Sequence, residues 1–96
     1  MDRQKTLGLL SQHKANLARL FGVVQLALFG SVARDTATAR SDVDVLAAFD
    51  GPATSAHYFG VQFYLEDLLG CPVDLVTDKA LRPKLQPFVE RDAVHV

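Results

Sequence analysis

Two stretches of the chain, VVQLALFGS (residues 23–31) and SDVDVLAAF (residues 41–49), decide the fold. Each holds a short apolar run of the length and composition of a buried strand, Val23–Phe29 in the first and Val43–Phe49 in the second. The first run ends in a Gly-Ser turn that can open a short helix, and aspartates open the second run. We therefore expect two buried strands, one followed by the turn and one headed by acidic residues.

Apolar residues recur at helical spacing before the first strand, from Asp2 to Leu20. The residues on this stripe are Leu7, Leu10, Leu17, Leu20 and Phe21. Asp2 is a suitable N-cap and Gly22 a suitable C′ residue, so the pattern predicts a helix that ends just before the strand.

A second helical pattern follows the second strand. Thr54 or Ser55 can cap it, and Gly70 ends it. Its apolar residues are Tyr58, Phe59, Val61, Leu65, Leu68 and Leu69. The aromatic residues of this helix are interpreted as core plus a flank, with an interface patch as the alternative reading of Phe59 and Phe63 together with Tyr58 and Tyr64.

The C-terminal third adds a strand at Pro72–Thr77 and a last helix that Asp78 can cap. The apolar face of that helix is formed by Leu81, Leu85, Phe88 and Val89. The tail Ala93–Val96 either pairs as an edge strand or stays loose. This alternation predicts an α/β (α+β) fold in which a small mixed sheet carries flanking helices.

Composition limits what this chain can be. Its 96 residues, 49% hydrophobic, predict a single domain over residues 1–96. Ten Lys and Arg against eleven Asp and Glu give a net charge of −1, which argues against direct nucleic-acid binding. The single cysteine, Cys71, cannot form an internal disulfide. No apolar run reaches membrane-spanning length and no signal-peptide core follows Met1, so we expect a cytoplasmic protein with no membrane partner.

The acidic residues that open the second strand suggest a chemical site. Residues two apart in a strand project to the same face, so Asp42 and Asp44 point the same way while Val43 and Val45 point into the other layer. Two carboxylates a few Å apart repel, and one of them is then hard to ionise. A divalent cation removes that conflict because it takes carboxylate oxygens as ligands.

A third acid strengthens this hypothesis. Asp74 interrupts an otherwise apolar strand, where a buried unpaired charge is costly. If that strand lies beside the second one, Asp74 completes a three-carboxylate cluster able to hold two metal ions, the usual device for in-line phosphoryl transfer. Two alternatives stay open: a solvated strand-entry turn for Asp42 and Asp44, and a buried ion pair with an arginine for Asp74.

The Gly-Ser turn supplies a matching phosphate site. Gly30 after a strand and Ser31 at a helix start allow backbone N–H groups and a hydroxyl to approach phosphates closely. Arg34 and Arg40 can add cationic contacts to a triphosphate. Arg34 can equally be a solvated residue on a short helix, and for Arg40 a surface position is favoured. Ten residues separate Ser31 from Asp42, so the arrangement reads G-S-x10-D-x-D.

In these motifs the chain resembles the minimal nucleotidyltransferases of the DNA polymerase β superfamily. The match runs from Leu28–Arg34 through Ser41–Leu46 to Val73–Val76. The length and the segments Leu81–Leu85 and Val89–Val94 are similar to the antitoxin members of toxin–antitoxin pairs whose toxin is a helical HEPN-domain ribonuclease. The resemblance implies a polymerase-β-like nucleotidyltransferase fold.

The resemblance also implies a function: transfer of AMP from ATP to a tyrosine hydroxyl of the toxin, its partner in a hetero-oligomer. Carried over by position, Gly30 and Ser31 cradle the triphosphate. Two Mg²⁺ ions are ligated by the three catalytic acids Asp42, Asp44 and Asp74, of which Asp74 also orients or deprotonates the incoming hydroxyl. One position departs from the pattern, because Asp35 stands where the family usually has glycine, which puts the loop geometry in question more than metal binding.

Two alternatives belong to other functional classes. A non-catalytic binding module would keep the fold and neutralise its partner by occlusion. A nucleotidyltransferase acting on a small molecule, such as an aminoglycoside, would need a partner or second copy to supply the acceptor site.

Overall fold

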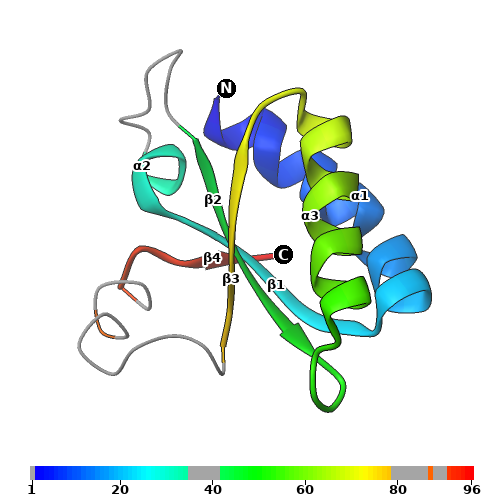
Figure 1. Cartoon of the computed structure of the whole chain (residues 1–96). Coiled ribbons are helices and arrows are strands. Elements are labelled where there is room, and N and C mark those ends of the chain that lie inside the picture. Colours follow the sequence, from blue (N-terminus) through cyan, green and yellow to red (C-terminus); the bar gives the residue numbers. More distant parts are fainter. Residues whose placement is uncertain (1, 35–41, 79–86, 88–90) are drawn as a thin grey trace.

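The computed structural model describes residues 2–34, 42–78, 87 and 91–96 (Figure 1). Within this part of the chain, three helices and four strands follow one another. They are α1 (Arg3–Phe21), β1 (Val23–Phe29), α2 (Gly30–Ala33), β2 (Val43–Phe49), α3 (Ser55–Leu69), β3 (Val73–Thr77) and β4 (Val94–His95). The helix predicted after Asp78 falls almost entirely on residues outside the described ranges.

The strands form one mixed sheet in the order β3-β2-β1-β4. β1 pairs antiparallel with both β2 and β4, and β2 pairs parallel with β3. The short β4 lies opposite Ala27 and Leu28 at the sheet edge, so the tail pairs as an edge strand. The predicted fold class, a small mixed sheet with flanking helices, is confirmed.

The crossover from β2 through α3 to β3 decides where polar residues meet. Parallel neighbours need such a connection, and it makes both strands start at the same end of the sheet (Figure 1). The register pairs Val43 with Val73 and Asp44 with Asp74. Residues near the starts of β2 and β3 therefore lie side by side although about thirty positions separate them in the chain.

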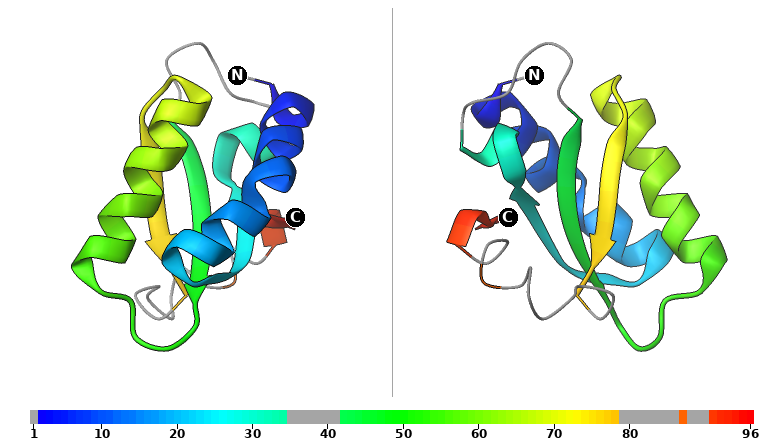
Figure 2. Two further views of the ribbon diagram at one scale, coloured as in Figure 1. Left: turned by 90° about the vertical axis from the view of Figure 1, so that its right-hand side faces the viewer. Right: turned by 60° about the vertical axis from the view of Figure 1, so that its left-hand side comes forward.

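Helices α1 and α3 pack side by side on one face of the sheet (Figure 2). The core lies between them and the sheet, where alternate strand residues point toward the helices. The largest fully buried apolar side chains are Leu10, Leu17, Val23, Leu26, Leu28, Val32, Val43, Val45, Val61 and Leu65. The opposite face of β2 and β3, which these helices leave uncovered, carries Asp44 and Asp74 together with the half-buried Leu46 and Val76.

Both long helices have the ends that the sequence predicts. The side chain of Asp2 accepts a hydrogen bond from the Lys5 N–H at 2.6 Å, and Gly22 ends α1 in the left-handed region at φ 73°. Thr54 caps α3 and Gly70 ends it. One residue of the predicted apolar stripe differs from its neighbours: half of the Leu20 surface is exposed, whereas Leu10 and Leu17 are fully buried.

The aromatic residues of α3 divide between core and surface. Tyr58 and Tyr64 are half-buried and pack against the core. Phe59 and Phe63 are 49% and 64% exposed, and their rings stack with centroids 6.2 Å apart. The half-buried tyrosines match the core part of the first interpretation, and with Phe59 and Phe63 exposed the interface patch stays a prediction.

No helix in the described ranges combines the length and apolarity needed to cross a bilayer. The longest of them, α1, has 19 residues and carries Arg3, Lys5, Lys14 and Arg19. Its buried residues Thr6, Leu10 and Leu17 follow the spacing of an amphipathic surface helix instead.

The contact between α1 and α3 depends on a glycine. A Cβ at Gly60 would lie 2.4 Å from the Phe21 ring, which also makes edge contacts with His57 and Tyr64. We expect Gly60→Ala to lower the free energy of unfolding by about 1 kcal/mol, because overpacking outweighs the better helix propensity of alanine. Gly8→Ala in α1, with open space around it, should raise that free energy by up to about 1 kcal/mol. Denaturant unfolding measures both changes, and equal stabilisation by the two substitutions would contradict this packing.

Candidate active site

The central pair of the candidate site is Asp44 and Asp74. They are directly opposed in the parallel register of β2 and β3, on the face of the sheet that α1 and α3 do not cover. The side chains of their strand neighbours Val43 and Val45 are fully buried on the helix side, as alternation requires. The prediction that the third strand lies beside the second and brings Asp74 to Asp44 is thus confirmed.

The environment of Asp74 differs from the one expected. Its side chain is exposed rather than buried, because neither long helix covers that face of the sheet. Among the ion pairs of the described residues none involves Asp74, so the alternative of a buried pair with an arginine finds no support there. Solvent stabilises the charge of the exposed Asp74 carboxylate. The stability of the fold does not explain why this acid lies opposite Asp44.

Asp44 is the acid that is hard to ionise. Burial is the largest cause that raises its pKa, to about 6, and the negative charge of Asp74 is the next. The protonated carboxyl of Asp44 donates a hydrogen bond to Asp74, and the charge of Asp42 raises the pKa further. Repulsion between neighbouring carboxylates was the expected cause; desolvation contributes more because Asp44 is half-buried beneath the turn after β1.

Gly30 forms that turn and touches the acid directly. Phe29, the last residue of β1, is paired with Asp44, so the chain turns immediately above the carboxylate. Gly30 has φ 73°, and a Cβ on it would lie 2.1 Å from Oδ2 of Asp44. The left-handed backbone conformation favours glycine at this position, and a Cβ there would also have to displace the Asp44 carboxylate.

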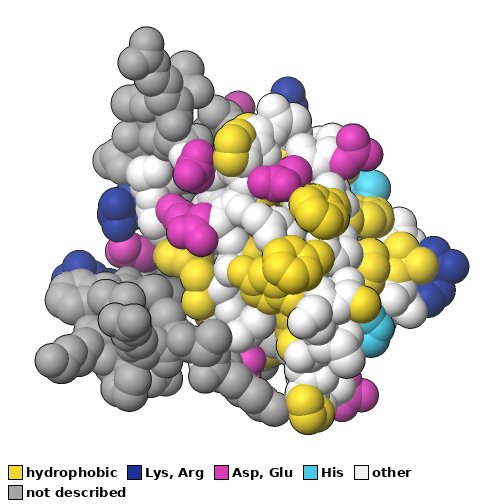
Figure 3. Space-filling model, in the orientation of Figure 1, with side chains coloured by type: hydrophobic (Ala, Val, Ile, Leu, Met, Phe, Trp, Pro, Cys, Tyr) yellow, Lys and Arg dark blue, Asp and Glu magenta, His cyan; other side chains and the backbone are white. Residues whose placement is uncertain are grey.

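The remaining predicted residues surround this pair. Ser31 occupies the first turn of the short helix α2, and Arg34 is its C-cap residue. Arg34 lies close enough to Asp44 for its positive charge to oppose the rise in the pKa of that carboxyl. Figure 3 shows acidic side chains gathered where β2 and β3 begin, with a basic side chain on the α2 side. The structure thus brings Gly30, Arg34, Asp42, Asp44 and Asp74 into one site, while Asp35 and Arg40 lie outside the described residues.

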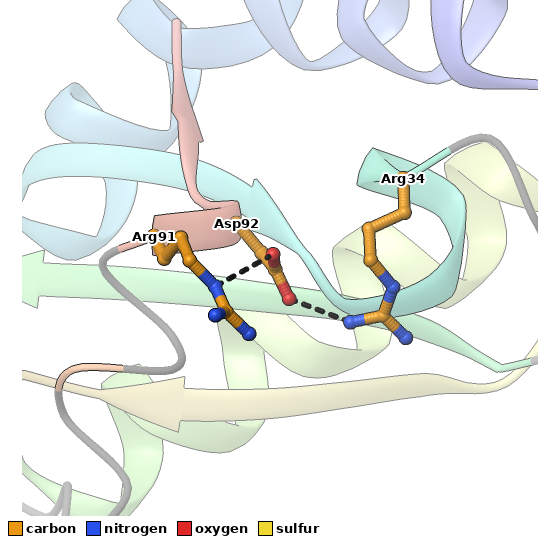
Figure 4. Close-up of polar contacts among 3 residues, drawn as sticks. All are labelled: Arg34, Arg91 and Asp92. Carbon is orange, nitrogen blue, oxygen red and sulfur yellow. Dashed lines mark hydrogen bonds and ion pairs between the residues drawn. The ribbon is translucent and has the colours of Figure 1, made fainter.

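Sequence reasoning missed one residue beside this site. Arg34 donates a hydrogen bond from Nη1 to Oδ2 of Asp92 at 2.6 Å (Figure 4). Asp92 precedes β4, 58 positions from Arg34 along the chain. No local spacing signals such a contact, because only the docking of the C-terminal tail onto β1 creates it.

The carboxylates suit a hard divalent cation in chemistry. Asp44 and Asp74 present oxygen donors in contact with one another, with Asp42 in electrostatic range, and a cation would offset the burial and the repulsion that raise the pKa of Asp44. Within the described ranges, however, no group of three or more acidic, histidine or cysteine side chains is arranged to hold a metal ion as it stands. The donor set is therefore a contacting pair with a third carboxylate nearby, rather than a closed cluster.

An acidic pair beside a glycine turn that can approach phosphates is typical of proteins that handle nucleotides with metal ions. The chain matches the nucleotidyltransferase domain family over residues 10–95, and it belongs to that family. It is 38% identical over 88 residues to protein adenylyltransferase MntA of Thermococcus cleftensis, covering 92% of this chain and 89% of the relative. It is 37% identical over 89 residues to "Putative protein adenylyltransferase MJ0128" of Methanocaldococcus jannaschii, covering 92% and 91%.

Solved structures agree with this assignment. The "Structure of putative minimal nucleotidyltransferase" matches with a TM-score of 0.82 at 37% identity and covers 98% of this chain and 95% of that one. A chain of the structure of tri-AMPylated Shewanella oneidensis HEPN toxin in complex with MNT antitoxin matches with a TM-score of 0.61 at 18% identity, covering 97% of this chain and 66% of that one. A toxin–antitoxin structure with AMP-PNP matches at 0.71 and 20%, covering 99% and 72%. At such low identity the last two show the fold alone, and together these matches confirm the minimal nucleotidyltransferase fold.

The raised pKa of Asp44 predicts how stability depends on pH without divalent cations. Because the folded state binds this proton more tightly than the unfolded state, the stabilisation is complete below pH about 4 and is lost as the pH rises through about 6. Discounted for solvent screening, the loss amounts to about 1 kcal/mol. Asp44→Asn should remove this part of the pH dependence, as urea unfolding at pH 4, 5, 6 and 7 in EDTA would measure. An unchanged slope between pH 4 and 7 would contradict the assignment.

Two glycines with the same φ of 73° test the contact between Gly30 and Asp44. Gly22→Ala has open space and should cost about 1 kcal/mol for the left-handed backbone alone. Gly30→Ala must also displace the Asp44 carboxylate, so we expect an additional cost of about 1–3 kcal/mol or a lowered Asp44 pKa as the pair separates. Denaturant unfolding and carboxyl NMR titration give the two readouts; equal costs with an unchanged pKa would exclude the close approach.

Proposed function

We propose that this protein is an antitoxin that transfers AMP from ATP to a tyrosine hydroxyl of a cognate HEPN-domain ribonuclease toxin. The observation that carries the proposal is the register that opposes Asp44 and Asp74 next to the Gly30 turn. Membership of the nucleotidyltransferase family and the names of the protein adenylyltransferase relatives support the reaction type. The structure of a tri-AMPylated HEPN toxin in complex with MNT antitoxin, which contains a chain of this fold, supports the class of partner.

In this mechanism the chain binds ATP at the start of α2. Gly30 and Ser31 hold the triphosphate through backbone N–H groups and the serine hydroxyl, and Arg34 contacts its anionic oxygens. Asp42, Asp44 and Asp74 would hold two Mg²⁺ ions, which supply charge neutralisation for the triphosphate and for the attacking oxygen. Bound cations would favour the ionised form of Asp44, whose pKa is about 6 without them.

Asp74 acts on the hydroxyl group that accepts AMP. As the most exposed acid of the pair, it is open to a hydroxyl arriving from a partner, and it orients that hydroxyl and accepts its proton. The hydroxyl oxygen bonds to the α-phosphorus, the bond from that phosphorus to the bridging oxygen breaks, and pyrophosphate leaves. AMP remains on the tyrosine oxygen, which adds negative charge to the toxin.

We expect Asp74→Asn to reduce AMP transfer by about a hundredfold or more, while the metal-free protein keeps or raises its melting temperature. The melting temperature is kept or raised because the substitution relieves the repulsion with Asp44. Measuring it separates a loss of catalysis from a loss of folding. The experiment is intact-mass measurement of the co-purified HEPN partner after incubation with ATP and Mg²⁺, for wild type and for Asp74→Asn. Asp67→Asn on α3 is the matched control, since it makes the same change at an exposed acid on the other side of the sheet.

Addition of whole AMP units by wild type and Asp67→Asn, but not by Asp74→Asn, would support the proposal. A stable complex without any mass change, in which Asp42→Ala and Asp44→Ala still neutralise the toxin, would favour a binding module instead. AMP found on a small molecule rather than on the protein partner would favour the third functional class. A lower melting temperature of metal-free Asp74→Asn would assign Asp74 a structural role.

A further inference from the structure

A salt bridge ties the C-terminal segment to the candidate site. Nη1 of Arg34 lies 2.6 Å from Oδ2 of Asp92, and the Asp92 side chain is only 16% exposed, against 52% for Arg34. Figure 4 shows the arginine reaching from the end of α2 toward the segment that leads into β4. The acid is the more deeply buried partner, so its carboxylate has less freedom to move than the guanidinium. The carboxylate therefore holds the guanidinium in place.

The arginine is held where a phosphate group would come. The Arg34 backbone N–H closes the α2 turn onto the Gly30 carbonyl at 3.1 Å, so its side chain starts one turn from the Gly-Ser start of that helix. The contact with Asp92 uses a terminal nitrogen, and about half of the side chain remains exposed. Since a guanidinium carries five N–H donors, the exposed part can still bind an anion.

Asp92 also has a second basic neighbour. Its other oxygen, Oδ1, lies 4.0 Å from Nε of Arg91. The carboxylate therefore faces two guanidinium groups, and Arg34 is not its only cationic contact.

We propose that Asp92 is a positioning residue of the nucleotide site: it holds the Arg34 guanidinium beside the Gly30-Ser31 turn, oriented for the triphosphate. Asp92 acts through Arg34 and does not touch the nucleotide. A free arginine side chain loses rotamer freedom when it binds a phosphate, and an arginine already held by a carboxylate loses less. This inference rests on the proposed function, because it takes ATP as the ligand of the turn.

A double-mutant cycle tests the inference on the full chain. The measurements are the Kd of ATP–Mg²⁺ by calorimetry and the KM and kcat of AMP transfer to the HEPN partner. We expect Asp92→Asn to raise Kd and KM about fivefold with kcat within twofold, and Asp92→Glu, which keeps the charge, to recover most of the affinity. In the Arg34→Ala background Asp92→Asn should have no further effect, since the residue that it positions is gone. Asp67→Asn again controls for the change in net charge.

Four results would overturn the inference. Equal weakening by Asp92→Asn with and without Arg34 would mean that Asp92 supports the fold rather than the arginine. Tighter ATP binding by Asp92→Asn would mean that the carboxylate competes with the triphosphate for Arg34. An unchanged Kd in Asp92→Asn, with normal binding by wild type, would refute the positioning role alone, whereas failure of wild type to bind ATP–Mg²⁺ would refute the proposed function with it.

Discussion

The parallel pairing of β2 with β3 is the constraint on which the site depends. Backbone hydrogen bonds between the strands hold Asp44 opposite Asp74, although burial and mutual repulsion disfavour two ionised carboxylates there. The same strands place Val43, Val45, Val73 and Leu75 in the core on their other face. Apolar burial on one face thus offsets the electrostatic cost on the other, because strand alternation couples the two faces rigidly.

Chain connectivity explains why such a small protein can build this arrangement. The α3 crossover makes β2 and β3 start together, and the antiparallel β1 delivers its last residue to the same end of the sheet. Gly30 follows at once, so the turn lies directly against Asp44. Three segments that are remote in sequence therefore meet at one end of the sheet. Among the described residues, no long loop takes part in this contact.

The tail adds a further tie between fold and site. β4 is only two residues long, yet its pairing with β1 brings Asp92 to Arg34 at the end of α2. Arg34 lowers the pKa of Asp44 and is itself held by Asp92. Protonation, cation binding and nucleotide binding would therefore all affect the same group of charges. Changes at the C-terminal segment and at the acidic pair are for this reason expected to be coupled energetically.

The sequence by itself determined the helices and strands of the described residues and singled out most residues of the candidate site. Apolar periodicity, the caps Asp2 and Thr54 and the end at Gly22 are local signals, so the helices and strands follow from neighbouring residues. The same holds for the spacing that singles out Gly30, Ser31, Asp42 and Asp44. Only the tertiary structure decided that Asp74 is exposed, that desolvation dominates the pKa of Asp44, and that Arg34 pairs with Asp92. These properties depend on which face the helices cover and on where the tail docks, and contacts between distant segments leave no periodic trace in the sequence.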